Sequence, residues 1–359
     1  MGSTARTKKN QPLQCVAKNF AALLGLILIF ALGVTSSCSS SPKHEPNLSP
    51  NKEISITPQV TALGTVITTL GDNFSPSFSA DDKKIIYISK QRPSHTQAQI
   101  YLFDLNSKKE RRITYQDGDC SQPVFLKNNQ HFLYASTTDE LKERPLLLYK
   151  KSMDSSWPHS ELYMSDLTGV NIDRLTRSEG YDGSPSVLPN QDSIITYAKS
   201  NRKNIEAWQM NYENRKTFPV LRKKGISILS LKAATGEKKW VWVEQLDDGT
   251  TQVLVTEKGL RGASENILPN LKWNYRQALW WNPDRLILNA KTNSPESKFQ
   301  LYTYTLSTKC LQLLAEAPAD ILDPSLNEDA TTMVFSSMVA GNSQILMKNL
   351  ADPTGACLQ

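Results

Sequence analysis

The chain of 359 residues contains 41 basic and 35 acidic residues, which gives a formal net charge of +6. Four of the basic residues lie within the first 18 positions, where no acidic residue occurs, so the rest of the chain has a net charge of about +2. This balance gives no electrostatic basis for nucleic acid binding.

The first 37 residues have the pattern of a secretory signal peptide. A basic segment precedes an apolar run at 20–34, which is short for a transmembrane helix of about 20 residues. The small residues before Cys38 resemble the lipobox of bacterial lipoproteins, where this cysteine becomes the first mature residue and carries lipid. Thr35 departs from the family pattern, which usually has Leu. An uncleaved anchor or ordinary signal-peptidase cleavage is the alternative.

The charge and composition predict three segments along the chain. Residues 1–37 form the signal peptide, residues 38–57 form a lipid-bearing flexible tether rich in Pro, Asn and Ser, and residues 58–359 form one folded domain. Membrane attachment is therefore expected through an N-terminal lipid on Cys38.

The domain contains a unit that recurs every 40–50 residues. The unit at Ser75–Ser89 has an inner strand beginning Ser-Pro, a polar turn and a second apolar strand, and related units begin at Ser121 and Gly183. Strand-built repeats of this period are typical of β-propeller blades. The fold class is therefore all-β, and a propeller by itself does not specify a function.

We predict six blades of four antiparallel strands, of which the fourth is degenerate. The sixth blade lacks one strand before the chain ends, and Val66–Thr69 stands where an outermost strand is expected. This N-terminal strand is expected to complete the last blade and close the ring, which removes exposed sheet edges. The strands expected after each inner strand are Ile85–Ser89, Gln99–Leu105, Arg111–Thr114, His131–Ser136, Glu161–Leu167, Asp173–Thr176, Ser193–Ala198, Ile205–Met210, Phe218–Leu221, Lys239–Glu244, Thr251–Thr256, Glu265–Leu268, Arg285–Ala290, Gln300–Leu306, Cys310–Leu314, Thr332–Ser336 and Gln344–Leu350.

The inner Ser-Pro-x-aromatic strand, the Ile/Leu-Tyr-x-x-Asp-Leu strand and the Arg-Ile/Leu-Thr edge together resemble the repeats of TolB-like six-bladed propellers. The resemblance covers most of the predicted domain and is strongest in the first three blades. TolB itself carries a separate α/β domain before its propeller. The tether expected at that place here indicates a TolB-like protein that is not TolB.

After Cys38, the cysteines are Cys120, Cys310 and Cys357. An exported chain permits one disulfide among them, but the sequence does not identify the pair, and three free thiols are the alternative.

No catalytic or cofactor-binding pattern is found in the sequence. There is no Gly-x-Ser-x-Gly elbow, no phosphate-binding glycine loop and no cysteine pair at metal-ligand spacing. The four histidines are scattered, whereas a His-rich metal site would need several on one surface. We therefore expect no enzyme activity, metal or cofactor.

Aspartates recur just ahead of the inner strands, where they are expected at one mouth of the central channel. A ring of carboxylates there would bind a cation or a basic peptide. The interpretation that we prefer is that these aspartates cap turns of their own backbone. The candidates are Asp72, Asp117, Asp119, Asp182 and Asp323.

A long connection in the second blade, Thr137–Ser160, is expected on the same face as these aspartates. It contains Tyr149 and Trp157, which are residue types enriched at interfaces, so it is either a binding loop or a tolerated insertion.

Five tryptophans cluster in the fourth and fifth blades, at positions 240, 242, 273, 280 and 281. A sugar-stacking platform is conceivable, but packing between blades is the simpler interpretation. Trp280 and Trp281 are adjacent and must point to opposite faces, so at most one of them faces the channel.

Two functions remain as hypotheses. The first is a non-catalytic lipoprotein of the bacterial envelope, on the periplasmic side of the outer membrane, whose propeller binds an envelope protein or peptide. Ser39 follows the lipid cysteine in place of the Asp that favours inner-membrane retention in enterobacterial lipoproteins. The alternative is a periplasmic propeller that binds or cleaves glycans with the tryptophans and the aspartate ring.

Overall fold

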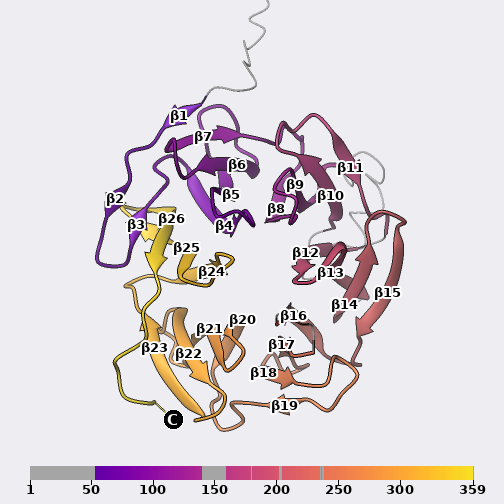
Figure 1. Cartoon of the computed structure of the whole chain (residues 1–359), viewed down its shortest axis with the longest axis vertical. Helices are drawn as coiled ribbons and strands as arrows, with labels where there is room; N and C mark the ends of the chain where they lie inside the picture. Colours follow the sequence, from indigo (N-terminus) through magenta and orange to yellow (C-terminus); the bar gives the residue numbers. More distant parts are fainter. Residues whose placement is uncertain are drawn as a thin grey trace, which may run out of the picture. The chain divides into compact units, whose positions relative to one another are not determined.

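The strands form six antiparallel sheets that are arranged as the blades of a propeller around a central axis (Figure 1). The structure is a computed structural model that describes residues 53–139, 159–178, 180–201, 204–234, 236 and 238–358. The predicted signal peptide and Cys38 lie outside the described residues. Within the described residues, no helix has the length and apolar character required to cross a membrane.

The chain builds each blade as a meander that begins at the innermost strand, so the blades follow one another in sequence order. Blade 1 contains β4 (Asp72–Phe78), β5 (Lys84–Lys90), β6 (Gln99–Asp104) and β7 (Lys109–Arg112). Blade 2 contains β8 (Cys120–Phe125), β9 (His131–Ser136), β10 (Glu161–Asp166) and β11 (Ile172–Arg174). Blade 3 contains β12 (Asp182–Leu188), β13 (Gln191–Asn201), β14 (Asn204–Asn211) and β15 (Lys216–Leu221). Blade 4 contains β16 (Ser227–Ala233), β17 (Trp240–Gln245), β18 (Thr251–Thr256) and β19 (Glu265–Asn266). Blade 5 contains β20 (Asn274–Asn282), β21 (Arg285–Lys291), β22 (Gln300–Thr305) and β23 (Cys310–Ala315). Blade 6 contains β24 (Ile321–Leu326), β25 (Thr332–Val339) and β26 (Asn342–Asn349). The prediction of an all-β propeller with six blades is confirmed, and the blade whose repeat is degenerate in the sequence, blade 4, is a complete four-stranded sheet.

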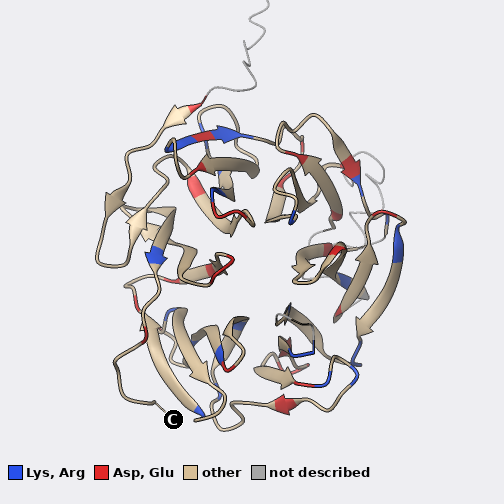
Figure 2. Cartoon of the chain, in the orientation of Figure 1, with Lys and Arg blue, Asp and Glu red and all other residues tan. Residues whose placement is uncertain are grey.

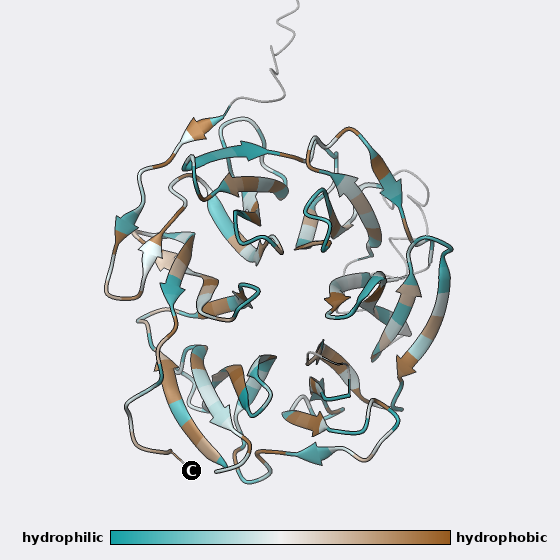
Figure 3. Cartoon of the chain, viewed as in Figure 1, coloured by the Kyte–Doolittle hydropathy of each residue, from teal (hydrophilic) through white to brown (hydrophobic). Residues whose placement is uncertain are grey.

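Neighbouring blades pack against each other through the two faces of each sheet. On β5, Ile85 and Tyr87 belong to an apolar cluster with side chains of blade 6, whereas Ile86 belongs to a cluster with side chains of blade 2. Because both faces of the sheet are covered, the strand is apolar at successive positions instead of alternating. The apolar segments of the middle strands are brown in Figure 3.

The predicted closing strand is present as β3 (Thr65–Val66). Val66 pairs with Leu346 of β26, so an N-terminal strand completes the last blade. The segment continues the contact beyond β3, because Ile67 N–H donates to Ile345 O at 2.9 Å and Thr68 Oγ1 accepts from Ile345 N–H at 2.9 Å. The ring is therefore closed by residues from the two ends of the described domain.

Two short strands extend the sheets beyond four strands. β1 (Ile54–Ser55) pairs with β7 at the outer edge of blade 1, and β2 (Gln59–Val60) pairs with β3 in the last blade. Ile56, directly after β1, is buried. The sheet structure thus begins a few residues before position 58, where the sequence placed the start of the domain.

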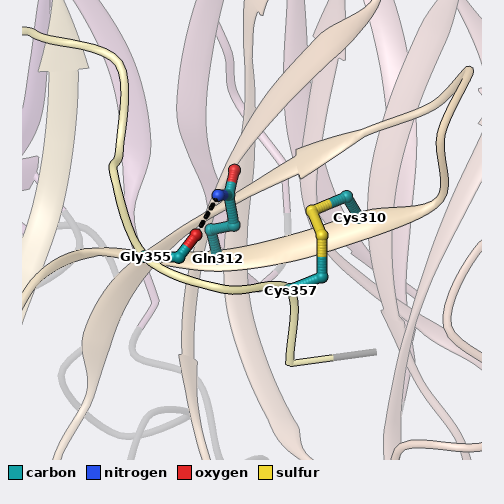
Figure 4. Close-up of a disulfide and its surroundings, with 4 residues drawn as sticks. All are labelled: Cys310, Gln312, Gly355 and Cys357. Carbon is teal, nitrogen blue, oxygen red and sulfur yellow. Dashed lines mark hydrogen bonds between the residues drawn. A yellow bond between two sulfur atoms is a disulfide. The ribbon is translucent and has the colours of Figure 1, made fainter.

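The segment after β26 returns to blade 5 and is held there by a disulfide between Cys310 and Cys357 (Figure 4). The two Cα atoms are 5.2 Å apart. Leu358 N–H donates to Leu311 O at 2.7 Å, and the Gln312 side chain donates to Gly355 O. The sequence left open which of the three cysteines are paired. The structure pairs Cys310 with Cys357 and leaves Cys120 as a buried free thiol.

Candidate functional site

The six inner strands surround a cavity of about 670 Å³. Every blade contributes to its wall, with β4, β8, β12, β16, β20 and β24 each supplying lining residues. One lining residue from each strand, in chain order, is Ser75, Gln122, Ser184, Lys232, Trp280 and Asp323. The inner strands carry few charged residues and are mostly tan in Figure 2.

Four inner strands share one backbone feature at this wall. Ser75, Gln122, Ser184 and Asp323 each precede a proline and have φ between 47° and 52°, in the left-handed region. In each strand the pairing register with the next strand shifts at this point, as in a β-bulge. Because proline has no N–H, it loses no ladder hydrogen bond as a donor at the bulge, and the bulge redirects the neighbouring side chains. This repeated pre-proline position therefore shapes the cavity wall.

Hydrogen bonds join the walls of neighbouring blades. Gln122 Oε1 of blade 2 accepts from the Tyr181 hydroxyl at 2.9 Å and from Ser184 N–H of blade 3 at 2.7 Å. Asp323 of blade 6 accepts from Ser75 Oγ of blade 1 at 3.0 Å and forms an ion pair with Arg276 of blade 5 at 3.4 Å. These contacts hold the lining side chains in fixed positions across the blade boundaries.

Lys232 is the charged residue of the described lining whose charge is not balanced by an ion pair, since Arg276 and Asp323 pair with each other. Its Nζ donates to Ser186 Oγ at 3.0 Å, and among the ion pairs of the described residues none involves Lys232. Burial disfavours the charged ammonium and lowers the pKa of Lys232 to about 8. Lys232 was not among the candidates predicted from the sequence, although a lysine inside the apolar inner strand Ser227–Ala233 was a usable signal.

The five predicted aspartates occupy different places. Asp323 lines the cavity, while Asp72 accepts from Ser343 N–H at 3.2 Å and Asp119 accepts from Ala98 N–H at 2.8 Å. Asp182 is buried and pairs with Lys199 at 3.3 Å, and Asp117 is exposed ahead of β8.

The repeat explains this difference between the aspartates. Asp323 stands at the pre-proline position that Ser75 and Gln122 occupy, whereas Asp72 and Asp119 lie three residues earlier in their units. The predicted aspartates therefore do not occupy equivalent positions of the repeat. In the part of the chain that the structure describes, no group of three or more His, Cys, Asp or Glu side chains is arranged to hold a metal ion.

Trp280 lines the cavity, and its Nε1 donates to Lys232 O at 3.3 Å. The adjacent Trp281 packs into a different apolar cluster and donates to Ala330 O at 3.0 Å. Trp240 and Trp242 are buried between blades 3 and 4, and Trp273 packs near Tyr302 with ring centroids 4.9 Å apart. Of the five tryptophans, Trp280 is thus the one at the cavity.

The candidates Tyr149 and Trp157 lie outside the described residues. The two ends of their connection are described: Thr137 N–H donates to Asp119 O at 3.1 Å, and Ser160 Oγ donates to Asp182 O at 2.9 Å. The connection therefore leaves and rejoins the propeller beside two of the predicted aspartates, as strand parity indicated.

No family model matches the chain, and no curated protein is significantly similar to it in sequence. Solved structures with the same fold include TolB from Acinetobacter baumannii, with 13% identity and a TM-score of 0.56 over 76% of this chain and 66% of that chain. A TolB candidate from Agrobacterium tumefaciens matches with 9% identity and a TM-score of 0.56 over 84% and 98%. An oligogalacturonate lyase in complex with manganese matches with 13% identity and a TM-score of 0.51 over 84% and 98%.

These similarities show a TolB-like six-bladed propeller fold. An enzyme and TolB share this fold, so the fold does not decide between catalysis and binding. The match spans just under two thirds of the Acinetobacter chain. The function must therefore be argued from the cavity.

Proposed function

We propose that this protein is a non-catalytic binding scaffold of the bacterial cell envelope that receives a segment of a partner protein in its central cavity. The observation that carries the proposal is a cavity to which all six inner strands contribute. A volume of about 670 Å³ falls within the range of ligand sites, about 300–1,000 Å³.

The lining favours a peptide over a reacting substrate. Prolines and aliphatic side chains line the cavity together with Ser, Gln and Tyr groups that form hydrogen bonds, so the wall offers a peptide both apolar contacts and a few placed polar groups. The charged lining side chains are Lys232, Arg276 and Asp323, and the last two pair with each other. Among the described lining residues this leaves no pair of carboxylates for acid and base roles.

The disulfide supports the proposed location. A bond between Cys310 and Cys357 is expected to persist in an oxidising compartment, and the predicted signal peptide directs the chain to one. The likeness to TolB structures is compatible with an envelope protein. We place the protein at the periplasmic face of the outer membrane, anchored by lipid on Cys38.

A glycan-binding role is the second candidate, because one tryptophan, Trp280, lines the cavity and a lyase shares the fold. The other four tryptophans pack between blades or against apolar clusters and do not line the cavity. A stacking platform built from several rings is therefore not present among them, and the peptide role is the better supported.

Affinity capture from native envelopes tests the proposal, with bound proteins and glycans both identified. Ser325→Trp places a bulky ring in the cavity, and Thr217→Trp on the exposed outer strand β15 is its matched control. We expect a specific envelope protein to be captured by the wild type and by Thr217→Trp, and to be lost with Ser325→Trp. Retention of that protein by Ser325→Trp rules out the cavity as its site, and capture of polysaccharide alone favours the glycan role.

A further inference from the structure

The charges of the cavity wall do not balance. Two cations, Lys232 and Arg276, and one carboxylate, Asp323, line the cavity. Asp323 already forms the ion pair with Arg276 and accepts a hydrogen bond from Ser75. The uncompensated charge of the wall is therefore at Lys232, and its sign is opposite to that of the aspartate ring considered from the sequence.

The immediate surroundings of Lys232 leave hydrogen-bonding capacity unused. A lysine ammonium has three donors, and one of them is directed to Ser186 Oγ. Ser230, two residues earlier on β16, also lines the cavity, and its buried Oγ has no hydrogen-bond partner. Two polar groups of one inner strand thus meet at the same wall: among the described residues, Ser230 Oγ has no hydrogen-bond partner, and the Lys232 ammonium has one such partner and no ion pair.

An unsatisfied buried polar group and an uncompensated ammonium each cost folding free energy, unless a ligand completes them. A carboxylate satisfies both requirements, because it supplies a negative charge for Lys232 and oxygens that accept hydrogen bonds from the ammonium and the serine hydroxyl. A basic or neutral segment would leave Lys232 without a counter-charge.

From this arrangement we propose that Lys232 and Ser230, beside Ser186, form a carboxylate-binding site in the cavity. The inference rests on the proposed scaffold function and specifies its partner: the inserted segment carries an acidic side chain or ends in a free C-terminus at this point. Trp280, which donates to the backbone oxygen of Lys232, forms the adjoining apolar wall.

Short peptide probes test the site on the full mature chain. The probes are acetyl-Gly-Glu-Gly-amide, acetyl-Gly-Gly-Gly with a free C-terminal carboxylate, and the uncharged acetyl-Gly-Gln-Gly-amide. Binding is followed by NMR of the labelled lysine Cε groups, with the Lys232 signal assigned by its loss in Lys232→Arg. We expect at least one acidic probe to bind about tenfold more tightly than the Gln probe at pH 7 and to raise the pKa of Lys232. The stronger of the two acidic probes identifies the source of the carboxylate.

The variants separate charge from shape. Lys232→Met should remove the preference for the acidic probe, whereas Lys232→Arg should retain a preference. Binding of the acidic probe should weaken between pH 7 and pH 9.5 as Lys232 loses its proton, and the other ionisable side chains of the lining are Arg276, Asp323 and Tyr181. Equal binding of the acidic and Gln probes, or no perturbation of Lys232 by either acidic probe, overturns the inference.

Capture from envelopes distinguishes failure of this inference from failure of the scaffold function. If the partner is lost with Ser325→Trp but captured equally by Lys232→Met and Lys232→Arg, the scaffold function stands and the carboxylate site is wrong. If Ser325→Trp has no effect on capture, the cavity is not the partner's site, and the proposed binding of a partner segment in the cavity fails.

Discussion

Ser75 Oγ of the first inner strand donates a hydrogen bond to Asp323 Oδ2 of the last inner strand at 3.0 Å, across the seam where the ring closes. The two residues are 248 positions apart in the chain, and both are pre-proline residues with left-handed backbone at the cavity wall. The same repeat position therefore shapes the cavity and joins the first blade to the last.

Loss of the seam hydrogen bond should have a modest effect on stability. Ser75→Ala removes the donor to Asp323, and one hydrogen bond to a charged group contributes about 1.5 to 3 kcal/mol at most. Because Asp323 keeps Arg276 as a partner, we expect the free energy of unfolding in urea to fall by about 1 kcal/mol. Ser264→Ala, at an exposed serine, is the control and should change it very little. An equal effect of both substitutions contradicts a role for the seam contact.

Because the N-terminal strand closes the ring, we predict that Ile67 contributes more to stability than its place near the end of the domain suggests. Ile67 is 1% exposed and packs with Val334 and Ile345 of the last blade. Ile67→Ala should lower the free energy of unfolding by about 2 to 4 kcal/mol, as for other buried aliphatic truncations. Val60→Ala, in β2 at a side chain that is 86% exposed, should remain within about 0.5 kcal/mol of the wild type. Similar values for the two variants would show that the N-terminal strand is not part of the stable ring.

The disulfide should stabilise the link between blade 5 and the segment after β26. Cys310 and Cys357 are 47 residues apart, and the chain-entropy model then gives a stabilisation of about 4 kcal/mol as an upper value. The double variant Cys310→Ser with Cys357→Ser should unfold at a lower temperature than the oxidised protein. Reducing agent should lower the unfolding temperature of the wild type and leave that of the double variant unchanged. If reducing agent affects neither protein, the bond does not contribute to stability.

We predict that the stability of the fold decreases as pH rises, because of the raised pKa of Glu161. This carboxyl is buried in β10, and desolvation raises its pKa from 4.5 to about 7 even though Thr176, Ser178 and Arg174 bond to it. A group whose pKa is raised on folding binds its proton more tightly in the folded state, so its contribution to stability is lost as pH rises from about 4.5 to 7. Glu161→Gln should reduce that decline, measured by urea unfolding at pH 5 and pH 7. An unchanged difference between the two pH values would show that Glu161 does not titrate in this range.

Much of the ring is readable from the sequence, because each blade repeats one local pattern of strand, polar turn and strand. The closing strand at Val66 was predictable because the last blade lacked a strand. In contrast, β1 and β2 have two residues each, and their pairing with β7 and β3 is decided by tertiary contacts that no local pattern encodes.

The cavity was less predictable, because side-chain direction at the inner strands depends on the bulges. Asp72 and Asp323 were both expected just ahead of an inner strand, so they looked alike in the sequence. Asp323 stands at the pre-proline position of the repeat and Asp72 stands three residues before it, and only Asp323 of the two lines the cavity. Lys232 was missed because the inner strand of blade 4 lacks the pre-proline position that marks the inner strands of blades 1, 2, 3 and 6. The pairing of Cys310 with Cys357 required the path of the chain after β26, which composition and spacing do not give.

The most direct test of the central claim is photocrosslinking from inside the cavity in native envelopes. A photoreactive phenylalanine analogue at Trp280 reports on the cavity, and the same group at Thr217 on the outer strand of blade 3 reports on background contacts. The account predicts an adduct at position 280 with one envelope protein, at a peptide that mass spectrometry maps to a single segment, and no such adduct from position 217. The same adducts from both positions, or adducts with polysaccharide alone, would contradict it.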